Sequence, residues 1–242
     1  LINARWERRT ETGLGYHIGY TQSGIHFNPG TGFEMMQDYS SIGGSLRYGW
    51  ISPEKSKLYS HSPEIRFMYR RFIDDGTFMN FTNFTGWRFQ TKNQWIFDLN
   101  LVFNIDNLRD SLTILEDELY ILPGKYIYSN LEATVTTPQS QPFYAILMTE
   151  TGQYYDGERI SFSLQPVWNI SKHFEIGGTY NLDYVSVKER NVSMINHIAG
   201  IKALYMLDTK LSVNAYIQYN TAVHGIITNF RFRYNPKEGN DL

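Results

Sequence analysis

The residues of this chain that could carry out chemistry are adjacent acids. Carboxyl groups stand next to one another at Asp74-Asp75 and at Glu116-Asp117-Glu118. Glycoside hydrolysis uses two carboxyl groups, but it needs them held apart across a substrate. Neighbouring acids in loops are more often solvated charge. We therefore predict no catalytic residue from these two groups.

Metal and cofactor sites are not indicated either. The 6 histidines show neither HxH nor HExxH spacing, so zinc would require distant strands to converge. The acidic stretch 106–118 lacks the D-x-D-x-D-G order of a calcium loop. The sequence contains no GxSxG, Walker A or GxGxxG motif, and no Cys. The prediction is that there is no metal ligand and no cofactor-binding residue.

The elements that must position any site are strands. In the stretch from Gln94 to Ile105 (QWIFDLNLVFNI) large apolar residues alternate with mostly polar ones, as in a strand with one apolar and one wet face. About twelve alternating residues exceed the roughly five or six of an ordinary strand. Roughly nine to eleven tilted residues cross a bilayer core. The pattern therefore favours a membrane-crossing strand.

Similar segments follow one another along the chain. We predict an all-β fold: an antiparallel, up-and-down transmembrane β-barrel of the outer-membrane type, with roughly 12–16 strands in a single domain, 1–242. Tight turns at 169–173 and 207–210 are expected on one rim, with longer connections at 106–124 and 185–194 on the other. Pro166 is expected to mark a bulge or a strand end. The side chains expected to face lipid are Trp95, Phe97, Leu99, Leu101, Phe103, Phe162, Leu164 and Trp168.

Charged residues on the polar side of these strands are expected to line a wet lumen. Unpaired buried charge costs several kcal/mol, so we expect arginine–carboxylate pairs across strands. These charges either brace the wall or select a permeating anion. The candidates are Arg66, Arg70, Arg88, Asp98, Arg159, Asp183, Lys202, Arg231 and Arg233.

Composition narrows the class of protein. The mean hydropathy of −0.38 reflects the lack of any run of about twenty apolar residues that would make a membrane helix. A formal charge of −2 provides no basic field for nucleic acid, which is not an expected partner. The alternative is a soluble β-sandwich or lipocalin-like barrel with its apolar rows turned inward, and alternation alone does not decide between them.

Two features of the ends suggest an excerpt of a longer protein. The chain starts at Leu1 without a signal peptide. Residues 235–241 (NPKEGND) read as a polar turn that leads into Leu242. We therefore expect the domain to be cut at both ends.

The tail 224–242 (HGIITNFRFRYNPKEGNDL) resembles the C-terminal end of an outer-membrane β-barrel domain of unknown function from Gram-negative bacteria. The stretches FNPGTGFEMMQDYSSIGGSLRYGW and LPGKYIYSNLEATV are similar to the same family. In that family the barrel usually follows a domain similar to family 9 carbohydrate-binding modules. The resemblance implies an outer-membrane location, and no catalytic residue carries over.

The expected function is that of an outer-membrane β-barrel with a pore or transport, binding or anchoring role and no chemistry of its own. Its expected partners are outer-membrane lipid, an N-terminal periplasmic or surface domain of the same protein, and glycans. The alternative is the barrel part of a membrane-associated carbohydrate-binding protein or glycoside hydrolase whose active domain lies upstream. In neither case is this chain itself expected to be the enzyme.

Overall fold

The computed structural model describes residues 1–27, 30, 36–115 and 119–235. Their only helical element is one 3₁₀ turn, η1, Lys188–Arg190. None of the described segments is a helix long and apolar enough to cross a membrane. The strands are β1 (Ile2–Arg8), β2 (Gly13–Ser23), β3 (Tyr39–Ile51), β4 (Leu58–Phe72), β5 (Phe78–Thr91), β6 (Ile96–Leu108), β7 (Leu112–Leu115), β8 (Leu119–Ile121), β9 (Gly124–Thr136), β10 (Phe143–Tyr154), β11 (Gly157–Ser171), β12 (Phe174–Val187), β13 (Val192–Met206), β14 (Leu211–Asn220) and β15 (Gly225–Tyr234).

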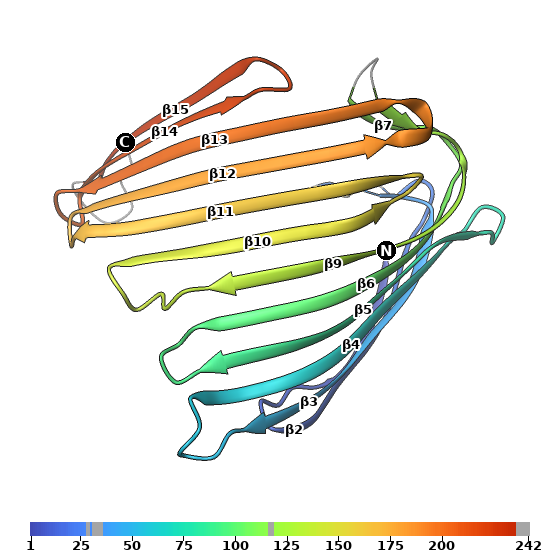
Figure 1. Cartoon of the computed structure of the whole chain (residues 1–242), viewed down its shortest axis with the longest axis horizontal. Helices are drawn as coiled ribbons and strands as arrows, with labels where there is room; N and C mark the ends of the chain where they lie inside the picture. The colour runs from blue at the N-terminus through green and yellow to red at the C-terminus, as the bar shows by residue number, and fades with distance from the viewer. Residues whose placement is uncertain (28–29, 31–35, 116–118, 236–242) are drawn as a thin grey trace. The chain divides into compact units, whose positions relative to one another are not determined.

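The strands form one large up-and-down sheet. A 13-stranded sheet follows the chain from β1 to β15, and β7 and β8 make a separate two-stranded hairpin. Figure 1 shows consecutive strands running back and forth beside one another. The predicted all-β, antiparallel, up-and-down fold is confirmed, whereas no closed barrel is found in the described part of the chain. Closure and membrane insertion remain predictions.

Contacts divide the chain into two compact units. Unit 1 comprises Leu1–Lys92, Asp98–Glu132 and Gly152–Gly157, and unit 2 comprises Asn93–Phe97, Ala133–Thr151 and Glu158–Leu242. Each unit is described below by itself.

In unit 1 the strand register sorts side chains into two faces. Residues opposite one another on antiparallel strands lie on the same face. One face, here called the apolar face, carries Trp6, Ile18, Tyr20, Ile42, Leu46, Trp50, Ile65, Phe67, Tyr69, Phe81, Trp87 and Phe89. The other, here called the polar face, carries Glu7, His17, Ser41, Ser45, Arg47, Ser62, Glu64, Arg66, Arg70, Asn80, Arg88 and Gln90.

The register of unit 2 produces the same separation. Its apolar face carries Phe162, Leu164, Trp168, Ile176, Tyr180, Leu182, Ile195, Ile201, Tyr205, Ile217, Phe230 and Phe232. Its polar face carries Arg159, Ser161, Ser163, Glu175, Asn181, Asp183, Asn196, Lys202, Asn214, Tyr216, Arg231 and Arg233. Alternation within each strand is thus matched by its neighbours, which is the condition for a sheet with two chemically distinct faces.

The register between β11 and β12 does not shift at Pro166, where the sequence predicts a bulge or a strand end. The β11–β12 register is the same on both sides of it, Leu164 opposite Tyr180 and Val167 opposite Gly177, and the irregularity lies between Asn169 and Ser171. A Cβ at Gly178 would be 3.1 Å from Pro166 Cγ. A glycine on the neighbouring strand therefore leaves room for the proline ring inside a continuous strand.

The connections differ in part from the expected short and long sets. The turns between β11 and β12 and between β13 and β14 are tight, as predicted. The connection expected to be long at 185–194 is short, because β12 continues to Val187 and β13 begins at Val192. The stretch 106–124 is long but contains the β7–β8 hairpin.

Candidate functional site

The side chains expected to face lipid are mostly exposed. Leu99, Leu101 and Trp168 keep 53%, 51% and 52% of their surface accessible. Trp95 and Phe103 are also exposed, whereas Phe97, Phe162 and Leu164 are half-buried. In unit 2, Phe162, Leu164 and Trp168 share the apolar face.

Four of the charged candidates form two ion pairs of the expected kind. In unit 2, Arg159 donates from Nε to Asp183 Oδ1 at 2.7 Å and from one terminal nitrogen to Oδ2 at 3.0 Å. The other terminal nitrogen is 3.5 Å from a carboxylate oxygen of Glu150. In unit 1, Arg88 lies 3.6 Å from Asp98. The Arg159–Asp183 pair is bidentate, the geometry that holds a guanidinium most firmly.

The remaining cationic candidates have different surroundings. The guanidinium of Arg66 lies 4.8 Å from the ring centroid of Phe84, and that of Arg70 lies 5.9 Å from the ring of Tyr39. Such positions over aromatic faces are favourable for cations. In the register of unit 2, Lys202, Arg231 and Arg233 lie opposite the neutral residues Tyr216, Asn214 and Ser212 respectively.

A hollow in unit 1 lies where the β1–β2 turn folds over the polar face. A side chain at Gly49 would collide with the main-chain oxygen of Glu11, so the glycine allows the turn to approach β3. Arg47, two residues earlier on β3, donates to that same oxygen of Glu11 at 3.3 Å. The turn is therefore attached to the polar face at its tip.

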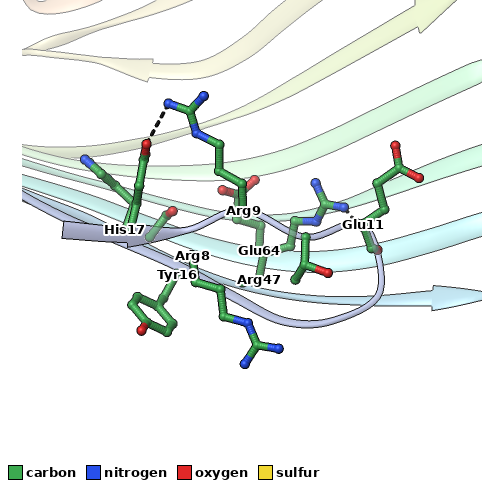
Figure 2. A pocket seen from close by; sticks show the side chains of 11 residues that line it. Arg8, Arg9, Glu11, Tyr16, His17, Arg47 and Glu64 are labelled. Atoms are coloured by element: carbon green, nitrogen blue, oxygen red, sulfur yellow. Dashed lines mark hydrogen bonds and ion pairs between the residues drawn. The ribbon is translucent and has the colours of Figure 1, made fainter. Parts of the chain in front are cut away.

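A groove of about 550 Å³ lies beside this turn. Its lining residues are Glu7, Arg8, Arg9, Thr10, Glu11, Gly15, Tyr16, His17, Ser45, Arg47 and Glu64. Glu7 forms an ion pair with Arg9, with 2.7 Å between a carboxylate oxygen and a guanidinium nitrogen. Glu7 lies opposite His17 in the register of β1 and β2. Figure 2 shows Arg8 and Tyr16 directed to the opposite side from Arg9, as expected for two residues that pair on the apolar face.

A second hollow of about 530 Å³ adjoins the first. It is lined by Glu11, Arg47, Ile51, Tyr59, Ser60, Ser62, Arg88 and Gln90. The two hollows share Glu11 and Arg47, and together they are called the charged groove. Arginines, serines and a glutamine make the second hollow suited to a small polar or anionic solute.

Sequence reasoning identified Arg88 but missed most of the charged groove. Glu7 was missed because the alternation of apolar and polar residues is weak in the first strand. Glu11 was missed because it lies in a turn, where alternation does not assign a side chain to either face of the sheet. His17 was considered only as a metal ligand. Arg47 could have been found, because it occupies the polar position between Ser45 and Gly49 in an alternating strand.

The described residues contain no group of three or more His, Asp or Glu side chains placed to hold a metal ion. The pair Asp74-Asp75 engages an arginine instead. Arg109 contacts Asp74 Oδ2 at 3.0 Å and Asp75 Oδ1 at 2.6 Å, and its guanidinium stacks 3.4 Å from the centroid of Phe72. This cluster joins the β4–β5 turn to the end of β6. The other acidic group, 116–118, lies outside the described residues.

Asp75 is expected to titrate well below an ordinary aspartate. Hydrogen bonds from the main chain and the hydroxyl of Thr77, aided by the charge of Arg109, lower the pKa of Asp75 from 3.8 to about 2. A lowered folded-state pKa means that the stabilising contact is complete above pH 3.8 and is lost as the pH falls through about 2. Carboxyl ¹³C shifts measured by NMR against pH should show this, and Thr77→Val should move the midpoint upward. A midpoint near 3.8 in the unsubstituted chain would contradict the assignment.

Tyrosines surround Asp106 near the β10–β11 turn in unit 1. Tyr128 donates its hydroxyl to Asp106 Oδ2 at 2.7 Å, and its ring lies 5.0 Å from that of Tyr155. Tyr155 adopts a φ of 51°, which is unusual for a large side chain. Burial, followed by the charge of Asp106, raises the pKa of Tyr155 to about 12. Because the rings pack on one another, we interpret the cluster as one that stabilises this turn.

No family model, curated protein or solved structure matches the chain. The resemblance to an outer-membrane barrel family therefore stays an expectation, and functional argument rests on the geometry of the two faces and the charged groove.

Proposed function

We propose that the chain forms the wall of a transmembrane β-barrel in the outer membrane of a Gram-negative bacterium, with a role in transport, binding or anchoring. One observation carries the proposal: large apolar side chains are exposed along one face, while few are buried. The buried hydrophobic residues in the described part of the chain are Met79, Val102, Leu119, Ile121, Tyr128, Val185 and Val187. A water-soluble domain of this size normally buries many more.

Polar atoms on the apolar face find partners within the sheet. In unit 1, Asn83 donates to the main-chain oxygen of Arg66 at 3.1 Å, and Thr85 donates to Asn83 Oδ1 at 3.0 Å. In unit 2, the hydroxyl of Tyr180 and Nδ1 of His197 are 2.9 Å apart. Polar groups that face hydrocarbon must be satisfied in this way, because lipid tails offer no hydrogen bonds.

Aromatic rings gather where the apolar face of unit 1 approaches the β3–β4 turn. The ring centroids of Tyr48 and Trp50 are 4.5 Å apart, and Trp50 stacks on His61 at 5.1 Å. Trp87 stacks on Phe89 at 5.7 Å, and its indole donates to His61 at 3.3 Å. A row of amphipathic rings near strand ends is typical of the membrane–water interface of outer-membrane barrels.

The soluble alternative places the apolar rows in a covered core. Leu99 and Leu101 in unit 1 and Trp168 in unit 2 instead remain more than half exposed. The polar faces, with their charged groove and ion pairs, are the faces that suit water. A wet, charged interior and an apolar exterior favour the membrane assignment.

Reconstitution tests this proposal. The purified chain, refolded in detergent and mixed with phospholipid vesicles, is expected to float with them and to resist alkaline extraction. In planar bilayers a transport role predicts a steady conductance whose anion preference falls in Arg231→Ala and Arg233→Ala. The control is Asn214→Ala, which removes a neutral side chain opposite Arg231 on the same face. Inserted protein without conductance would indicate binding or anchoring, whereas a folded chain that stays in the aqueous phase would refute the proposal.

A further inference from the structure

We propose that the second hollow of the charged groove binds a small tetrahedral oxyanion, a phosphate group that is either free in solution or part of a lipid headgroup. This inference goes beyond the barrel proposal and does not depend on it, because every residue of the hollow belongs to unit 1. It assigns a ligand to one largely polar hollow rather than to the face as a whole.

Two arginines supply the positive charge. Arg47 and Arg88 both line the hollow from the polar face, one on β3 and one on β5. The Nε atom of Arg47 is buried and has no hydrogen-bond partner within the described residues. A buried donor without a partner is costly, and an oxyanion would satisfy it. Guanidinium groups bind phosphate oxygens through parallel hydrogen bonds, so this pair suits the ligand.

Neutral donors complete the lining. Ser62 is only 6% exposed and lies opposite Arg88, while Ser60 lies opposite Gln90. Phosphate oxygens commonly accept hydrogen bonds from hydroxyl and amide groups as well as from guanidinium groups.

Nearby acids leave the two arginines available. Asp98 is 3.6 Å from Arg88, and half of the Arg88 side chain, 52%, remains exposed. Arg47 contacts Glu11 through the main-chain oxygen of the turn, and Figure 2 shows the Glu11 carboxylate extending away from the Arg47 guanidinium. Glu64 lines the neighbouring hollow and not this one. The charged residues that line the hollow are therefore two arginines and one acid, Glu11.

Phosphate titration of the refolded full chain in detergent tests the assignment. Isothermal titration calorimetry with inorganic phosphate is expected to show saturable binding. Arg47→Gln and Arg88→Gln should each weaken it by roughly tenfold or more, as is usual when a hydrogen bond to a charged group is removed. The matched control is Arg66→Gln, which removes a charge from the same face outside the hollow and should leave binding unchanged.

Two results would overturn the proposal: a response to phosphate that does not saturate, or one of equal strength in all three variants. Should Arg47→Gln fail to fold, Ser62→Asp provides the second measurement, since a carboxylate at that position should abolish binding by repulsion. Short-chain phosphatidic acid distinguishes the source of the phosphate. If it displaces inorganic phosphate, a lipid headgroup fits the hollow; if it does not, the hollow takes the free ion, and both outcomes support an oxyanion site.

Discussion

Leu99→Arg is expected to lower the free energy of unfolding of the membrane-inserted chain by about 2–4 kcal/mol, the cost of an arginine on the lipid face near the middle of a bilayer. Leu99 lies in β6 and is 53% exposed. In water, a leucine to arginine change at such an exposed position would cost little. The size of the effect therefore reports which solvent the apolar face meets.

Asn100→Ala is the matched control for this measurement. Asn100 is the next residue on the same strand and points to the opposite face, so its replacement should have a small effect on stability. Both variants can be compared by urea unfolding in phospholipid vesicles, followed by tryptophan fluorescence. Equal tolerance at the two positions would contradict the assignment of the faces and the membrane proposal with it.

The strands and their two faces were predictable from sequence because alternation is a local property. The pattern of residues 94–105 identifies β6, and a similar pattern identifies β11. In β11 the register with β12 places Phe162, Leu164 and Trp168 on one face, as their parity predicts. Alternation does not tell whether the apolar face is covered or exposed. That depends on how the whole sheet is arranged.

The errors arose where the outcome depends on residues that are distant in sequence. Pro166 stays within a continuous strand because Gly178 faces it on β12, a pairing that a single strand does not reveal. The ends of β12 and β13 extend into a stretch read as a loop, because pairing between Val187 and Val192 overrides their polar surroundings.

The charged groove was unpredictable for a similar reason. It exists because the β1–β2 turn folds back on β3, where Gly49 makes space and Arg47 holds the main-chain oxygen of Glu11. No spacing of residues in the sequence encodes that approach. The type of each lining residue is visible in the sequence. That these residues come together is a consequence of the tertiary fold.

A second glycine provides the other prediction with a large expected effect. Gly86→Ala on β5 is expected to destabilise the chain by about 1–3 kcal/mol, the usual cost of forcing extra atoms into a packed site. The new Cβ would overlap the side-chain oxygen of Asn100 and would lie 2.6 Å from the main-chain oxygen of Leu99. The amide of Asn100 can rotate away, but the oxygen of Leu99 is part of β6. Relief therefore requires β5 and β6 to shift apart.

Gly24→Ala is the control for Gly86→Ala, because a Cβ at Gly24 meets no atom within 4 Å. Urea unfolding in detergent micelles should give a lower midpoint for Gly86→Ala and an unchanged midpoint for Gly24→Ala. In an Asn100→Ala background the cost of Gly86→Ala should fall only in part, since the contact with the main chain of Leu99 remains. Complete rescue by Asn100→Ala would mean that the side chain alone sets the spacing of these two strands, and a neutral Gly86→Ala would show that β5 and β6 do not approach as closely as the structure places them.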